Sequence, residues 1–293
     1  MTPEVALILG IDGLANGAVY LLAGLGLVLI FSVTRVVFVP FGDVAALAAL
    51  SLAALETGKL PATVGLVATL AVLALVVEIR SLVVRGEKRR IPRALVGWGL
   101  LPALPCLAAW AIAGRAVPAP LQVVVAVGLV VPIIPLVARV ALQPIADASV
   151  LVLLIASLAL HYLLSGLGLL FFGPEGSRTA PLAGGAISLG GFSVSGQVLL
   201  MVGASLVLSG LFFLAFERTV AGKALRATAV NRIGARLVGI RPARTALLAY
   251  VCASLLAGLI GILVAPVTTM YYDSGFLIGL KAFVAAIIGG LVS

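Results

Sequence analysis

Several uninterrupted apolar stretches of 18 or more residues run through this chain, and they constrain its fold more than any other feature. A chain of 293 residues cannot bury that many such stretches in one water-soluble core, whereas each is long enough to cross a bilayer as a helix. The composition agrees, because 63% of the residues are apolar or aromatic and only 10% are charged. We therefore predict an integral membrane protein, and we exclude a cytosolic enzyme, a disordered chain, a collagen-like repeat and a disulfide scaffold.

Nine segments are apolar and long enough to be predicted membrane spans. They cover residues 6–32, 36–56, 62–79, 94–113, 119–138, 149–171, 196–216, 243–268 and 276–293. The expected fold class is therefore all-α, a polytopic integral membrane helical bundle that forms a single transmembrane domain over residues 1–293. Because the number of spans is odd, the two termini are expected on opposite sides of the membrane.

The distribution of lysine and arginine predicts the orientation, because cytoplasmic loops retain basic residues. With the N-terminus outside, the outside loops carry only Lys59, Arg115 and Arg178, and Lys281 lies within the last span. The inside loops carry Arg35, Arg80, Arg85, Lys88, Arg89, Arg90, Arg93, Arg139, Arg218, Lys223, Arg226, Arg232, Arg236, Arg241 and Arg244. Membrane topology thus explains the net charge of +9, and we expect membrane lipid and no nucleic acid as a partner.

Two long connections have distinct compositions. Residues 80–93 form a basic inside loop, which is expected to anchor the topology against anionic lipid. Residues 173–195 form an outside, periplasmic loop rich in glycine, proline and serine. Within it, apolar residues alternate with serine on both sides of Gly190-Gly191, and this pattern predicts a small β-hairpin.

The third long connection, residues 217–244, has small residues and arginines at helical spacing between residues 222 and 239. A helix there is too short and too charged to cross the membrane, so we expect it on the cytoplasmic face. Its pattern fits a helix that presents small residues and arginines to a partner protein, and it fits equally a helix that lies in the lipid interface.

The sequence lacks the common motifs of catalysis. Alanine follows Gly222-Lys223, so the phosphate-binding Gly-x-x-x-x-Gly-Lys-Ser/Thr is absent, as are Gly-x-Ser-x-Gly, His-Glu-x-x-His and Cys-x-x-Cys. We therefore expect no catalytic residue, no metal site and no ATPase activity in this chain. Cys106 and Cys252 are expected to be small buried hydrophobic residues. A membrane-embedded enzyme is the weakest hypothesis and would depend on His161 alone.

Polar residues inside the predicted spans are candidates for a translocation pathway, because they are costly in a bilayer. Asp43 follows Pro40-Phe41-Gly42, where proline and glycine predict a broken helix of the kind that lines a pathway. Lys281 either snorkels to the interface or forms an ion pair with Asp43. His161 is expected to bond to a neighbouring helix. An ion-coupled secondary transporter of small solutes, the alternative function, would titrate Asp43 or His161.

Three segments share motifs with a known family. The first comprises Asn16-Gly-Ala-Val-Tyr20 and the run from Leu25 to Arg35-Val36, and the second runs from Leu154 to Phe172-Gly-Pro-Glu175. The third comprises Gly222-Lys-Ala-Leu-Arg-Ala-Thr-Ala229, Ala235-Arg-Leu-Val-Gly-Ile240, Gly279-Leu-Lys-Ala-Phe283 and Ala285-Ala-Ile-Ile-Gly-Gly290, and it is the most specific. Together they cover about two thirds of the chain, which resembles the permease subunits of branched-chain amino-acid ABC importers.

The resemblance implies a helical permease of the bacterial inner membrane that pairs with a second, related permease subunit. It also implies two cytoplasmic ATP-binding subunits, which carry ATP and Mg, and a periplasmic or extracellular substrate-binding protein. The implied substrates are leucine, isoleucine and valine, or related small amino acids or amides. Residues 222–240 match the family's coupling segment, which fits into a cleft of the ATPase. The coupling residues expected on this basis are Gly222, Lys223, Leu225, Arg226, Thr228, Ala229, Arg232, Arg236, Leu237 and Gly239.

The chain departs from the family pattern in three places. At the start of its second helix the family reads Arg-Val-Ile-Asn-Phe-Ala-His-Gly-Glu, whereas this chain keeps the glycine and the acid as Gly42 and Asp43 and has Phe38 and Phe41 at the Asn and His positions. Residues 80–136 resemble an inserted basic loop and helical hairpin, which adds two spans and preserves the later topology. The chain ends at Ser293 where relatives continue, so we expect either a shortened permease or an incomplete chain.

Overall fold

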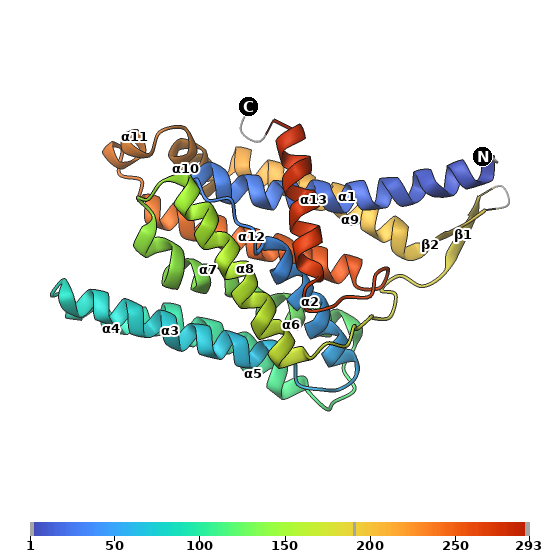
Figure 1. Ribbon diagram of the computed structural model, residues 1–293, viewed down its shortest axis with the longest axis horizontal. Helices are drawn as coiled ribbons and strands as arrows, with labels where there is room; N and C mark the ends of the chain where they lie inside the picture. Colours follow the sequence, from blue (N-terminus) through green and yellow to red (C-terminus); the bar gives the residue numbers. More distant parts are fainter. Residues whose placement is uncertain (1–2, 190–191, 291–293) are drawn as a thin grey trace.

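Long apolar helices run along the longest dimension of the molecule and determine its shape (Figure 1). The computed structural model describes residues 3–189 and 192–290. The α-helices are α1 (Pro3–Thr34), α2 (Phe41–Glu56), α3 (Thr63–Val84), α4 (Ile91–Ala94), α5 (Leu101–Ile112), α6 (Ala119–Val130), α7 (Ile133–Val137), α8 (Val150–Phe172), α9 (Gly196–Arg218), α10 (Val220–Val230), α11 (Arg232–Leu237), α12 (Pro242–Val264) and α13 (Ser274–Ile288). The predicted helical bundle is therefore confirmed.

Seven helical stretches in the described residues are long and apolar enough to cross a membrane. They are Leu9–Thr34, Thr63–Val84, Lys88–Ile112, Ala119–Ile145, Val150–Phe172, Gly196–Arg218 and Pro242–Val264. Helices α2 and α13 occupy two further predicted spans, but they have only 16 and 15 residues. At 1.5 Å per residue they extend roughly 24 Å and 22 Å, less than the ~30 Å hydrocarbon core. The predicted count of nine full spans is therefore not confirmed.

The predicted helical hairpin of residues 80–136 is present as two broken helices. Its first arm, Lys88–Ile112, passes through a π-helical stretch at Leu95–Leu100, and its second arm, Ala119–Ile145, is interrupted after Val130. Both arms pack against α3, and α5 packs against α6. That this hairpin is an insertion stays a prediction.

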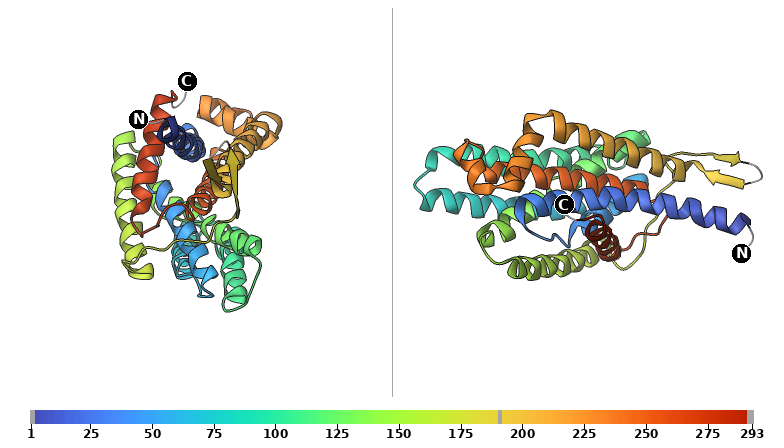
Figure 2. Two further views of the ribbon diagram at one scale, coloured as in Figure 1. Left: turned by 90° about the vertical axis from the view of Figure 1, so that its right-hand side faces the viewer. Right: turned by 90° about the horizontal axis from the view of Figure 1, so that it is seen from above.

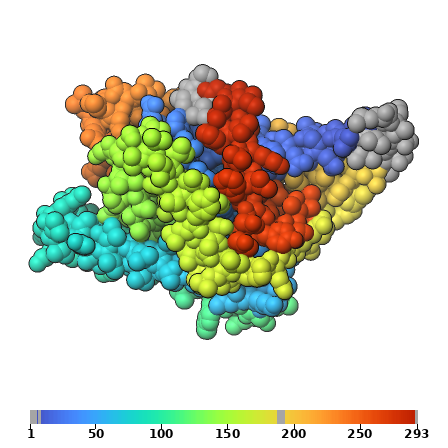
Figure 3. All heavy atoms as spheres, in the orientation of Figure 1, coloured from blue at the N-terminus to red at the C-terminus, as the bar shows by residue number. Residues whose placement is uncertain are grey.

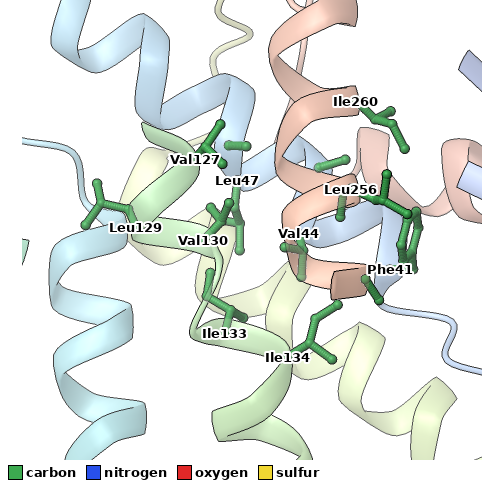
Figure 4. Packing of buried hydrophobic residues seen from close by; sticks show 14 of the residues in the cluster. Phe41, Val44, Leu47, Val127, Leu129, Val130, Ile133, Ile134, Leu256 and Ile260 are labelled. Carbon is green, nitrogen blue, oxygen red and sulfur yellow. The ribbon is translucent and has the colours of Figure 1, made fainter. Parts of the chain in front are cut away.

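Helix α2 forms the centre of the bundle. All of its residues except Ala54 and Glu56 are buried, and it packs against α12, α13 and α6. Figure 4 shows Phe41 of α2 against Leu256 of α12, with Val44 and Leu47 of α2 close to side chains of α6 and α12. Gly261 of α12 lets the two backbones approach, because a Cβ at this position would overlap the carbonyl oxygen of Ala45. A short, apolar helix is thus fixed on every side by protein.

The loops gather at two opposite ends of the molecule. At one end lie the N-terminal end of α1 and the hairpin of strands β1 (Ala186–Leu189) and β2 (Phe192–Ser195), and at the other lie α4, α10 and α11 (Figures 1 and 2). Hydrogen bonds join loops at the first end, where the amide of Gly114 donates to the carbonyl of Gly58 at 2.9 Å and residues 177 and 270 form a β-bridge. The basic loops 80–93 and 217–244 therefore share one end, as the predicted alternation of spans requires.

The predicted β-hairpin is confirmed in the described residues. Ile187 pairs with Val194 and Leu189 pairs with Phe192 in antiparallel register. The predicted Gly190-Gly191 turn lies outside the described residues. Gln197 anchors the loop to the bundle, because its side-chain amide donates to the carbonyl of Leu263 and its oxygen accepts from the amide of Leu182.

Candidate functional site

The chain is not helical between α1 and α2, although it remains inside the bundle. Helix α1 ends at Thr34, Arg35 has a left-handed backbone with φ of 61°, and α2 begins only at Phe41. Phe38, within this segment, is 1% exposed. A hydroxyl of α8 satisfies one backbone amide of this segment, since the amide of Val39 donates to the side chain of Ser157 at 2.8 Å. Irregular backbone at membrane depth is tolerated only where protein or a cavity surrounds it.

Pro40 explains why α2 starts late. Proline has no N–H, and it disfavours helical backbone in the residue before it, here Val39. The first helical hydrogen bond runs from the amide of Val44 to the carbonyl of Pro40. No side chain caps this end of α2, and in residues 3–189 and 192–290 the amides of Gly42 and Asp43 have no hydrogen-bond acceptor. The broken helix that the sequence predicted therefore exposes two free donors inside the bundle.

Asp43 forms a buried pair with His161 of α8. Oδ2 of Asp43 lies 2.7 Å from Nδ1 of His161, and the two side chains are 3% and 7% exposed. Oδ1 of Asp43 is also buried, and it has no hydrogen-bond partner in the described part of the chain. Phe276 of α13 stacks on the His161 ring with 4.8 Å between ring centroids. His161 is thus held between α2 and α13.

This pairing corrects one of the two roles considered for Lys281. Its ammonium group lies 5.8 Å from the ring centroid of Tyr20 on α1, and Asp43 pairs with His161 instead. Lys281 is exposed, so it occupies the outer side of α13 rather than the interior. A cation over an aromatic face is stabilised by the ring's negative surface. The sequence identified Asp43 and His161 separately, but their separation of 118 residues gave no signal that they meet.

Three glycines bring α13 into direct backbone contact with the start of α2. A Cβ on Gly42 would overlap the carbonyl oxygen of Gly275, and a Cβ on Gly275 would overlap the backbone of Asp43. A Cβ on Gly279 would lie 3.1 Å from the carbonyl oxygen of Val39. Figure 3 shows α13 and α8 covering this face of the molecule. In this conformation α13 therefore closes the start of α2.

An apolar cavity of about 220 Å³ adjoins this closure. Its walls come from α1, residues 37–39, α8 and α13, and they include Phe38, Leu154, Leu158, Phe276, Gly279 and Phe283. Phe276 links the two features, because it lines the cavity and also stacks on His161. The cavity and the Asp43–His161 pair therefore share Phe276 as a neighbour.

The predicted coupling segment is two helices rather than one. Asn231 has an extended backbone between them, and its side-chain oxygen accepts from the amides of Ile233 and Gly234 at 3.0 and 2.9 Å. The hydroxyl of Thr219 caps α10 by accepting from the amide of Gly222 at 3.0 Å. Gly239, with φ of 84°, follows the end of α11. Capping residues therefore divide the segment into an elbow, which we define as residues 219–240.

One face of the elbow anchors it to the bundle. Gly222, Leu225 and Thr228 are buried. Leu225 packs in a cluster with Leu29 and Val33 of α1, and the hydroxyl of Thr245 on α12 lies 3.2 Å from that of Thr228. Of the other predicted coupling residues, Ala229 and Arg232 are half-buried, and Lys223, Arg226, Arg236, Leu237 and Gly239 are exposed. The structure therefore separates the predicted residues into an anchoring set and an outward-facing set.

Large apolar side chains lie among the exposed basic residues of the elbow. Val230, Ile233, Leu237 and Val238 are 82%, 74%, 84% and 74% exposed. Apolar groups bounded by arginine are typical of protein interfaces. The pattern of small residues and arginines indicated this surface. The sequence did not show that these four apolar side chains would all be exposed.

Comparison with known proteins identifies a protein family. The sequence model of a protein family described as "Branched-chain amino acid transport system / permease component" matches residues 10–293. No curated protein and no solved structure matches the chain. The family match includes the broken start of α2, the hairpin of residues 80–136 and the elbow.

Proposed function

The chain belongs to the family of permease components of branched-chain amino acid transport systems, and from this premise we propose that it is the membrane-spanning permease subunit of an ATP-binding-cassette importer. It imports leucine, isoleucine and valine, or related small amino acids or amides, across the bacterial inner membrane. A second related permease, two cytoplasmic ATP-binding subunits and a substrate-binding protein complete the importer. ATP and Mg are held by the ATP-binding subunits.

The proposal places the N-terminus outside and the elbow inside. Its support is the asymmetry of charge, since the basic loops 80–93 and 217–244 lie at one end of the bundle, whereas Lys59, Arg115 and Arg178 belong to loops at the other. Positively charged loops remain in the cytoplasm during membrane insertion. The β-hairpin then faces the substrate-binding protein.

The observation that carries the proposal is the two-sided character of the elbow. Its outward face combines exposed apolar side chains, such as Ile233 and Leu237, with Arg226 and Arg236. Its inward face is fixed to α1 through Leu225 and to α12 through Thr228. An ATPase that grips the outward face therefore moves α1 and α12 directly. We assign residues 222–240 as the coupling segment on this basis.

In this proposal the translocation pathway passes the start of α2, at Pro40, Gly42 and Asp43. A helix that begins inside the bundle leaves polar backbone groups for a transported solute. Lys281 lies on the same helix as Gly275 and Gly279, which close this point. We assign Lys281 to the outer edge of the pathway.

Co-purification of the ATP-binding subunits tests the coupling role. In the double variant Arg236→Glu, Leu237→Asp, both changes fall on exposed side chains, so the permease folds and the recovered ATPase falls at least tenfold. The matched control is Arg89→Glu, which reverses a basic charge at the same end of the molecule outside the elbow. Unchanged ATPase recovery with the double variant would contradict the coupling role. Arg232→Glu is a weaker test, because Nε of Arg232 is buried.

The buried Asp43–His161 pair favours one alternative, an ion-coupled secondary transporter. Such a protein needs no ATPase. Uptake of leucine into vesicles that contain the permease alone, driven by a proton or sodium gradient, would favour the alternative. Uptake that requires the ATP-binding subunits and ATP would reject it.

A further inference from the structure

The start of α2 holds an acceptor of hydrogen bonds that nothing in the described chain uses. Asp43 is 2% exposed, and while its Oδ2 bonds to His161, its Oδ1 is buried without a partner. An unpaired carboxylate oxygen in a protein interior is costly, because burial removes the water that would otherwise solvate it. This oxygen is therefore suited to a ligand that carries a positive charge and N–H donors.

Hydrogen-bond donors also lie at the start of α2, next to the carboxylate of Asp43. The amides of Gly42 and Asp43 have no acceptor in residues 3–189 and 192–290, and they form the first turn of a 16-residue helix. The amide end of a helix carries a partial positive charge and binds carboxylates. Discontinuous helices in transporters use such ends to hold anionic groups of the substrate. The start of α2 thus offers one site for a cation and one for an anion within a single turn.

The apolar cavity is the third feature at this place, after the carboxylate oxygen and the free amides. It has a volume of about 220 Å³, its walls are apolar side chains, and it reaches Gly279, which packs on Gly42, and Phe276, which packs on His161. Cavities for drug-sized ligands have about 300–1,000 Å³, so this one suits a smaller group. An aliphatic side chain of a few carbons matches its size and chemistry.

Resting on the proposed function, we propose that Asp43, the amides at the start of α2 and this cavity together form the site that holds the substrate as a zwitterion during translocation. The ammonium group binds Oδ1 of Asp43, the carboxylate binds the amides of Gly42 and Asp43, and the side chain enters the cavity. The substrate class is therefore an α-amino acid with an apolar side chain. Simple amides are excluded, because they carry neither charge and would leave both polar partners unsatisfied.

The site is closed in this conformation and needs α13 to move. Gly275 and Gly279 lie directly on Gly42 and Asp43, so the substrate enters only when α13 withdraws from α2. Phe276 moves with α13, because it lies between its neighbours Gly275 and Gly279 on that helix. Withdrawal of α13 therefore opens the wall between the cavity and Asp43.

Leucine uptake by the complete importer, reconstituted in proteoliposomes, tests the site. Asp43→Asn keeps the size of the side chain and its hydrogen bond to His161 but removes the charge that binds the ammonium group. We expect leucine uptake at least tenfold below the wild type, with ATP hydrolysis retained. Glu78→Gln is the control, because it removes the charge of an ion pair elsewhere in the bundle, between Glu78 and Arg139. Its uptake stays close to that of the wild type.

A second variant tests the cavity and leaves the Asp43–His161 pair unchanged. Leu158→Phe fills space beside Phe38 and Phe276, so the ratio of leucine to alanine uptake falls at least fivefold. The control is Leu151→Phe, which lies on the same helix and is 65% exposed.

The two proposals fail in different ways. If the wild-type complex imports no leucine with ATP, the proposed function fails. If the wild-type complex imports leucine, the zwitterion site is overturned by wild-type uptake in Asp43→Asn or by an unchanged ratio in Leu158→Phe. If Asp43→Asn does not assemble, the ratio in Leu158→Phe decides alone.

Discussion

The helices of this protein start in two different ways. At the ends of the bundle, side chains of Ser149, Ser195, Thr219 and Asn231 accept hydrogen bonds from the first amides of α8, α9, α10 and α11. Helix α2 starts inside the bundle, and no side chain caps it. Helices α3, α6, α12 and α13 also lack a capping side chain, but within residues 3–189 and 192–290 only α2 has a buried carboxylate oxygen without a partner in its first turn.

This difference distinguishes helix starts that only shape the fold from a helix start that can bind a ligand. In a capped helix start, a nearby side chain already accepts hydrogen bonds from the first amides. The caps of α10 and α11 serve to fix the shape of the elbow. The start of α2 is incomplete, because two amides and a carboxylate oxygen lie unused beside a glycine contact. An ionisable group buried at membrane depth is costly and marks a candidate functional site. The three predictions below test how far the two kinds of helix start differ.

The largest effect is expected from Gly42→Ala. The new methyl group would overlap the carbonyl oxygen of Gly275, and a backbone atom cannot move aside as a side chain can. We expect a loss of more than about 3 kcal/mol of stability, above the usual cost of overpacking. Thermal unfolding of the purified permease in detergent, followed by size-exclusion chromatography after heating, measures the loss.

The control for this change is Gly203→Ala on α9, where no atom lies within 4 Å of the added Cβ. Alanine favours a helix over glycine, so this variant is unchanged or slightly more stable. Equal midpoints for the two variants would show that α13 does not press on α2.

An intermediate effect is expected from His161→Ala. It leaves both carboxylate oxygens of Asp43 buried without a partner, which costs about 2 kcal/mol. The double variant Asp43→Leu, His161→Leu removes both polar groups and is expected to unfold at a higher temperature than His161→Ala. If His161→Ala unfolds at the wild-type temperature, the pair contributes nothing to the closed state.

The smallest effect is expected from Asn231→Ala. It removes the oxygen that accepts from the amides of Ile233 and Gly234, which costs about 1 kcal/mol and acts only on α11. Hydrogen exchange measured by mass spectrometry should rise in residues 231–240 and stay unchanged in α2. Faster exchange throughout α1 and α12 would show that the elbow supports the bundle more than its own cap implies.

The sequence predicted most of the helices, because uninterrupted apolar stretches allow little else. It placed the second span at residues 36–56, whereas α2 starts at Phe41. The residues before Pro40 are apolar and continue the pattern of a membrane helix, so composition alone did not separate them. Only the restriction that Pro40 imposes on Val39, together with the left-handed Arg35, marks the segment as irregular.

The site was only partly predictable for a physical reason. Proline, glycine and an acid in adjacent positions identified a broken helix with a polar group, which is a local property. The partners of that group, His161 and Gly275, come from segments more than a hundred residues away, and their arrival depends on how whole helices pack. The division of the elbow at Asn231 was within reach of the sequence, because asparagine caps helices strongly, but the flanking helical spacing obscured it.

The contact of Gly42 with Gly275 has a consequence for the energy balance of the cell. Two backbones that touch with no side chain between them leave no space for a water molecule, and water-filled paths are one route by which ions leak across a membrane. In this conformation the glycine contact therefore leaves no path for water between α2 and α13 at this point. In the proposed ATP-driven importer, such a contact keeps the membrane energised between transport cycles.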